Sequence, residues 1–266
     1  MYGASKNGRC FKHLTPKLFF MRNKTIARHI AILGFFVVSL PGNSQELFAK
    51  YLSKDHFTPR LEKLRHEYGI NKTIPPEIEL ECLTALSYYP ELKNIKIIFK
   101  FGSPVSTMVS RPKLKSIFRS GNKREYQVVV RKSGASKNGL EWNELSFNSL
   151  IGWIAHELGH IVHYSHKTSG GILFTGIKYG FPGYRRRMER FTDNLVIQHD
   201  LGYALFEGTD YCINYSNAKP HYKKYLQKYY LSPIEIKEAI NVKSFYKIAY
   251  NKTKLINQDP DSNFKL

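Results

Sequence analysis

Residues 146–165 read SFNSLIGWIAHELGHIVHYS, and the rest of the chain is organised around this segment. Its apolar side chains recur at intervals of three and four residues, as on one broad face of an α-helix. These apolar positions are Leu150, Ile151, Ile154, Leu158, Ile161 and Val162. Ser146 precedes them and is a residue type that favours a helix N-cap. The segment therefore predicts a long helix with a broad buried face.

Two histidines and a glutamate lie inside this segment, in the order His156-Glu157-Leu158-Gly159-His160. Positions four apart share one helix face, so His156 and His160 can bind one ion together. Zn²⁺ accepts two imidazoles at this spacing, and a carboxylate and a water complete its tetrahedron. Glu157 then lies beside the water, where it can take a proton and pass it to a leaving amine. The motif predicts hydrolysis with Zn²⁺ as cofactor and Glu157 as general base.

Such a site needs a third protein ligand, and two residues compete for this position. Glu189 lies in the run MERFTD, and Asp193 follows one helical turn later. We expect Glu189 to bind the metal and Asp193 to accept the N–H of a ligating histidine, which fixes its tautomer. The alternative is His166, ten residues after His156, which is the metzincin spacing. Metzincins have Gly where this chain has His163, and that Gly permits the turn that returns the third histidine to the metal. The sequence favours Glu189.

The flanking patterns predict a small sheet and further helices. We expect strands over Asn94–Gly102, Val105–Val109 and Glu125–Lys132. We expect helices over 46–68 with a break near Pro59, from Pro75 to about Tyr89, over 185–201, and short ones opening at Pro220 and Pro233. Residues 168–184 hold five Gly and one Pro and predict a mobile loop, either a lid or a packed hydrophobic loop. The fold expected is α+β, with a small mixed sheet packed against the HExxH helix and the Glu-bearing helix and with helical N- and C-terminal additions.

The pattern HELGH followed by ERFTD resembles that of the gluzincins, the thermolysin-type zinc peptidases, and its spacing is similar to that of the compact minigluzincins. The resemblance covers about residues 76–202. It implies a zinc-dependent endopeptidase that acts on a peptide or protein substrate, and a strand 125–132 that forms the sheet edge where the substrate lies extended. The chain lacks the spanning helices of the membrane-embedded members and a clear downstream His-Pro element. Candidates for stabilising the transition state are therefore His221, Tyr184 and Tyr203.

The N-terminal segment has the pattern of a secretory signal. Arg22, Lys24 and Arg28 precede the apolar run Ile30–Leu40, and the small and polar residues 42–45 follow. We therefore expect residues 1–45 to be an overlong start followed by a signal segment, with Met21 as the true start. Residues 46–266 then form a single exported zinc metallopeptidase domain, in a bacterial periplasm or cell envelope.

Composition limits the remaining functions. The chain has 266 residues, 42% of them apolar, and 37 aromatic residues, which excludes a disordered chain. Residues 46–266 hold 34 Lys and Arg against 21 Asp and Glu, a net charge of +13. Such a surface attracts anionic partners, among them an envelope polymer, but no nucleic-acid-binding motif accompanies it. A noncatalytic binding protein on a peptidase-like scaffold is the alternative function.

Cys82 and Cys212 can pair in an exported protein or remain two buried thiols.

Overall fold

The central element of the fold is helix α4, Phe147–Ser165. The computed structural model describes residues 51–132, 134 and 139–258, all of which fall in one compact unit, Phe48–Leu266. The N-terminal signal segment and the proposed start at Met21 lie outside the described residues. As the sequence predicts, Ser146 caps α4, and its hydroxyl accepts the N–H of Ser149 at 3.0 Å.

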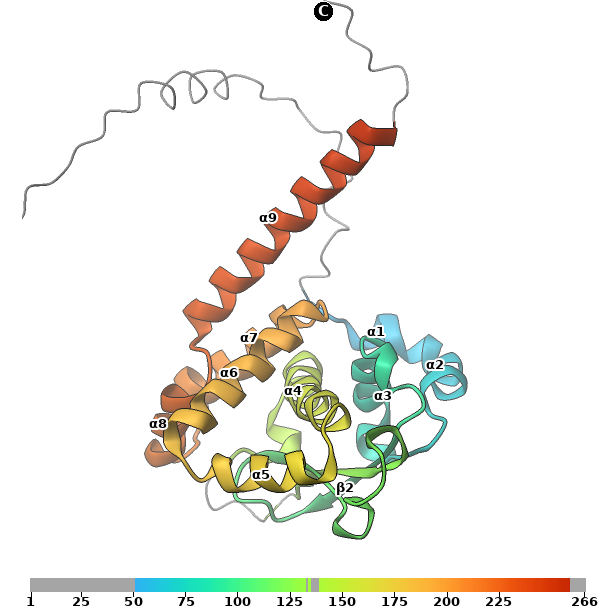
Figure 1. Cartoon of the computed structure of the whole chain (residues 1–266). Coiled ribbons are helices and arrows are strands. Elements are labelled where there is room, and N and C mark those ends of the chain that lie inside the picture. Colours follow the sequence, from blue (N-terminus) through green and yellow to red (C-terminus); the bar gives the residue numbers. More distant parts are fainter. Residues whose placement is uncertain (1–50, 133, 135–138, 259–266) are drawn as a thin grey trace, which may run out of the picture. The chain divides into compact units, whose positions relative to one another are not determined.

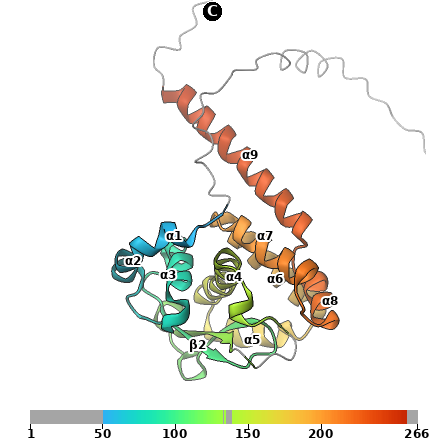
Figure 2. The same ribbon diagram turned by 180° about the vertical axis from the view of Figure 1, so that it is seen from behind.

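Most of the other elements lie around α4 in an α+β fold, whereas the long last helix projects away from it (Figure 1). The other helices are α1 Lys54–Phe57, α2 Leu61–Tyr68, α3 Glu79–Ser87, α5 Ser169–Tyr179, α6 Pro182–Gln198, α7 Gly202–Asp210, α8 Pro220–Tyr229 and α9 Pro233–Gln258. The strands are β1 Lys72–Thr73, β2 Lys96–Gly102, β3 Met108–Pro112 and β4 Glu125–Arg131. Seen from behind, α4 again lies between the group α1–α3 and the group α6–α8 (Figure 2).

A mixed sheet packs against α4 through β3. Its strand order is β1-β2-β4-β3, with β1, β2 and β4 parallel and β3 antiparallel to β4. The strand β4 is therefore interior, with Val128 opposite both Phe99 of β2 and Ser110 of β3. The expectation that strand 125–132 forms the sheet edge is wrong, because β3 takes the outer position beside it.

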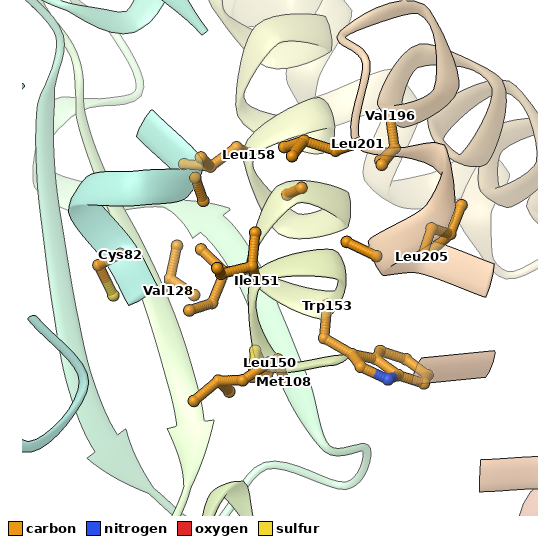
Figure 3. Packing of buried hydrophobic residues seen from close by; sticks show 14 of the residues in the cluster. Cys82, Met108, Val128, Leu150, Ile151, Trp153, Leu158, Val196, Leu201 and Leu205 are labelled. Carbon is orange, nitrogen blue, oxygen red and sulfur yellow. The ribbon is translucent and has the colours of Figure 1, made fainter. Parts of the chain in front are cut away.

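The core is built around α4, which contacts α3, α6, α7 and β3. Figure 3 shows Ile151 of α4 directed toward Val128 of β4, on the side of α4 where α3 lies. Trp153 is directed to the opposite side, toward α7. Because apolar side chains leave α4 in several directions, burial drives the helix into the centre rather than onto the surface.

Two residues let α4 sit this deeply. A Cβ on Gly152 would overlap the backbone carbonyl of Ala204, so Gly allows α4 and α7 to approach closely. At the other end, buried Arg124 donates to the carbonyls of Tyr164 at 3.3 Å and of Lys167 at 2.7 Å. Carbonyls at a helix C-terminus have no partner within the helix. Arg124 therefore stabilises the end of α4 from the segment between β3 and β4.

Three expected elements differ from the structure. Residues 168–184 are not a mobile loop: α5 begins after Thr168, whose hydroxyl accepts the N–H of Gly171 at 3.1 Å, and Ile172 and Thr175 are buried. The second strand lies at Met108–Pro112 rather than Val105–Val109. The last helix, α9, has 26 residues and is not short.

The remaining sequence expectations concern thiols and membranes. Cys82 and Cys212 are both buried and free of a disulfide, and burial raises the pKa of each thiol. No helix in the described part of the chain is both long and apolar enough to cross a membrane.

Candidate metal centre

Three buried side chains from two helices bring their ligand atoms together. His156 and His160 come from α4 and Glu189 from α6. The distance between the two Nε2 atoms is 3.1 Å, and Oε2 of Glu189 lies 3.0 Å from Nε2 of His156 and 3.1 Å from Nε2 of His160. The three atoms form a nearly equilateral triangle, and the exposed fractions of the residues are 1%, 6% and 0%. This group can hold one metal ion.

Two further residues of α6 orient the imidazoles from behind. Asp193 Oδ1 lies 2.9 Å from Nδ1 of His156, and its Oδ2 accepts the N–H of Leu231 at 2.8 Å. The hydroxyl of Thr192 lies 3.3 Å from Nδ1 of His160 and donates its own hydrogen to the carbonyl of Met188 at 2.9 Å. Both contacts favour a hydrogen on Nδ1, which leaves the lone pair of each Nε2 facing the centre of the triangle.

The helix α6 presents this set because of its spacing. Glu189, Thr192 and Asp193 stand at positions i, i+3 and i+4, so they share the face that packs on α4. The helices come close here because α4 has Gly159, where a Cβ would lie 2.9 Å from Cγ2 of Thr192. A larger residue at 159 would therefore crowd Thr192, whose hydroxyl contacts Nδ1 of His160.

The electrostatics of the triangle favour a bound cation. Burial lowers the pKa of His156, but its hydrogen bonds with Asp193 and Glu189 outweigh burial and raise the pKa above its ordinary value. Burial likewise raises the pKa of Glu189, but the charge of His160 and the hydrogen bonds of both imidazoles lower it overall. A proton is thus held among these groups when no other cation is present, and a bound metal ion would take the place of that proton.

The second oxygen of Glu189 has a separate partner. The hydroxyl of Tyr179, the last residue of α5, donates to Oε1 of Glu189. With Oε1 occupied, Oε2 alone faces the two imidazoles. The sequence did not indicate Tyr179 because residues 168–184 were expected to form a loop.

The competing ligand His166 lies elsewhere. It is the C-cap of α4 and is exposed, because α4 continues as a helix through His163 to Ser165. The chain makes no turn at His163, where a metzincin would bend, and this residue packs its ring against those of Tyr164 and Phe191. Burial, with like charges nearby, lowers the pKa of His163 to about 4. The structure therefore brings Glu189, and not His166, to the histidine pair.

An open cavity of about 600 Å³ adjoins the triangle. Glu157, which is only 6% exposed, lines it together with His160 and Glu189. All of β3 lines the cavity, and further lining residues come from α5 and α8. The cavity thus joins the candidate metal group, the expected general base and a sheet edge.

The tyrosines expected to stabilise a transition state are not the ones that the structure places here. His221 lines the cavity, whereas Tyr184 and Tyr203 do not. Tyr164, Tyr179, Tyr222, Tyr225 and Tyr230 line it instead. Tyr164 stands one helical turn after His160 on α4, so its position follows from helix spacing. Long-range packing brings the other four to the site, and no local sequence pattern could have selected them among 18 tyrosines.

Comparison with known proteins adds no relative: no protein-family model, no curated protein and no solved structure matches the chain.

Proposed function

We propose that the protein is a zinc-dependent endopeptidase with Glu157 as its general base. The observation that carries the proposal is the triangle of His156, His160 and Glu189 on the wall of a cavity that Glu157 also lines. A tetrahedral zinc site with bonds of about 2.0 Å has ligand atoms about 3.3 Å apart. The edges of 3.0 and 3.1 Å are close to this spacing, and two nitrogens with one oxygen form a donor set typical of catalytic zinc.

A bound zinc ion supplies a Lewis acid and makes water more acidic. The chain supplies the remaining functions. Glu157 accepts a proton from the attacking water and returns it to the amine that leaves. Asp193 and Thr192 hold the imidazoles in the tautomer that leaves Nε2 unprotonated.

The edge strand β3 supports a peptide as the substrate. An extended peptide can add to an exposed sheet edge through backbone hydrogen bonds. Every residue from Met108 to Pro112 lines the cavity, so a peptide along this strand passes the metal group. In this proposal the substrate therefore lies along β3, and not along strand 125–132 as the gluzincin resemblance implies.

The test is zinc analysis of the purified chain, with cleavage of a pooled peptide library read by mass spectrometry. We expect zinc, internal cleavage, and loss of cleavage on chelation. Glu157→Gln should keep zinc and lower the rate by about 10²–10⁴-fold, the usual contribution of general base catalysis. Glu238→Gln, on the exposed surface of α9, is the matched control and should keep full activity. A chain that holds zinc but cleaves nothing supports the alternative, a noncatalytic binding protein.

The ligand assignment has its own test. We expect Glu189→Ala to lose zinc and His166→Ala to retain it, because only Glu189 reaches the histidine pair. Zinc loss in the His166 variant alone would contradict the assignment.

A further inference from the structure

Arg185 is a half-buried cation beside the candidate metal centre. It lies on α6 four residues before Glu189, so the two side chains share one helix face, and both line the cavity. Its Nε donates to the carbonyl of Tyr179 at 3.1 Å. Its guanidinium carbon lies 5.0 Å from the ring centre of Tyr179 and 5.3 Å from that of Tyr229. The guanidinium is therefore held in place before any substrate binds.

This cation has no carboxylate partner within the part of the chain that the structure describes. Other arginines of the domain do have one, for example Arg65 with Glu79 and Arg190 with Glu235. A guanidinium that loses part of its hydration without gaining an anion favours binding one. Arg binds carboxylates with two parallel hydrogen bonds. Because Nε of Arg185 already donates to the carbonyl of Tyr179, a carboxylate would bind the two terminal nitrogens of the guanidinium.

The charges around the cavity also favour an anion. Its wall carries two acids, Glu157 and Glu189, and two arginines, Arg185 and Arg111 of β3. A divalent ion in the triangle makes this balance positive. The rest of the wall is largely apolar or aromatic. The two guanidinium groups are therefore among the few polar groups that can determine which substrate binds in the cavity.

The neighbouring arginines provide a comparison within the same helix turn. Arg186 and Arg187 are exposed and do not line the cavity. Of this run of three, only Arg185 reaches the cavity.

We propose that Arg185 binds a carboxylate of the substrate close to the bond that is cleaved, so that the protein acts as an endopeptidase on acidic peptides or, if the carboxylate is that of a free C-terminus, as a carboxypeptidase. This inference rests on the proposed function, since it names the substrate class of that same site. The shared chemistry is the carboxylate, and its source is either an Asp or Glu side chain or the terminal carboxylate.

The first measurement is cleavage of matched peptides. One pair differs by Glu or Gln beside the cleaved bond, and another by a free or an amidated C-terminus. We expect the carboxylate form of at least one pair to be cleaved about tenfold to a hundredfold faster, as expected for a charge-assisted hydrogen bond. Preference in the first pair identifies an acidic side chain, and preference in the second identifies the C-terminus.

Variants then assign the preference to one residue. Arg185→Gln should abolish it, Arg185→Lys should keep part of it, and the matched control Arg187→Gln should leave it unchanged. Zinc content equal to that of the wild type confirms that each variant retains the site. Equal cleavage of both members of each pair, or a preference that survives in Arg185→Gln, overturns the inference.

Binding separates this inference from the proposed function. The same peptides are titrated calorimetrically into zinc-loaded Glu157→Gln and into that variant with Arg185→Gln added. Tighter binding of the carboxylate form that disappears with Arg185→Gln supports the role of Arg185 even if the wild type cleaves nothing. Equal binding of both forms rejects it even if the wild type is an active peptidase.

Discussion

Asp193→Asn tests whether the hydrogen bond from His156 to Asp193 orients this imidazole for metal binding at the candidate centre. Both carboxylate oxygens of Asp193 accept hydrogen bonds, from Nδ1 of His156 at 2.9 Å and from the N–H of Leu231 at 2.8 Å. Asparagine has the same shape but only one acceptor oxygen, and its amide nitrogen is a donor. Two buried donors therefore compete for one acceptor, and one of them must lose its partner.

The two amide orientations have different consequences. If the NH₂ group faces His156, the imidazole must accept there and carry its hydrogen on Nε2, which blocks the lone pair that binds metal. Loss of such an orienting contact weakens metal binding by about 10–100-fold, or about 1.4–2.8 kcal/mol. If the NH₂ group faces Leu231, a buried N–H is left unpaired, and the free energy of unfolding falls by about 1–3 kcal/mol.

Zinc affinity is measured by competition with a chromogenic chelator, and the free energy of unfolding is measured in urea with the metal-free protein. The matched control is Asp210→Asn on α7, because Asp210 is half-exposed and its carboxylate accepts a hydrogen bond from the Asn214 side chain at 2.7 Å, away from the histidine pair. We expect the control to match the wild type in both measurements. Wild-type zinc affinity combined with wild-type stability in Asp193→Asn would refute the orienting role.

Three further perturbations test the packing and the charge of the domain. Gly152→Ala should lower the free energy of unfolding by about 1–3 kcal/mol in urea because its Cβ meets the Ala204 carbonyl, whereas Gly170→Ala, with open space around it, should cause no loss. After metal has been removed with a chelator and the chelator dialysed away, free zinc at one hundred times its Kd should stabilise the protein by about 2.7 kcal/mol. This is measured as a rise in Tm, which a variant with both His156 and His160 replaced by Ala should lack. His163 has a folded pKa of about 4, below its ordinary value of 6.5, so the unfolded chain binds more protons between these values and stability should fall as pH drops from 6.5 toward 4. His163→Leu should remove that part of the pH dependence in thermal unfolding of the chelated protein, and an unchanged pH profile would contradict it.

Local patterns predicted the parts of the site that depend on one helix at a time. The 3.6-residue period fixed the face of residues 146–165, and the spacing of His156 and His160 follows from helix geometry alone. Glu189 and Asp193 were also recognisable because they stand one turn apart. That α4 and α6 meet with these faces opposed is a tertiary fact, which depends on the close contact at Gly159.

Nonlocal contacts explain the expectations that failed. The five glycines between 168 and 184 have low helix propensity, so the sequence predicted a loop there. The N-cap at Thr168 and the burial of Ile172 outweigh this low propensity, and α5 forms. Strand 125–132 was recognised as a strand, but its interior position depends on pairing with β3, and no local pattern reports the neighbour of a strand.

The hydrogen bond from Leu231 to Asp193 has a consequence for biosynthesis. The ribosome makes the chain from its N-terminus, so His156, His160 and Glu189 emerge before residue 231. Until that residue follows, the nascent polypeptide has the ligands but lacks the backbone donor that holds the orienting carboxylate. We therefore expect the full set of contacts that orient the histidine pair to form only after residue 231 has been made.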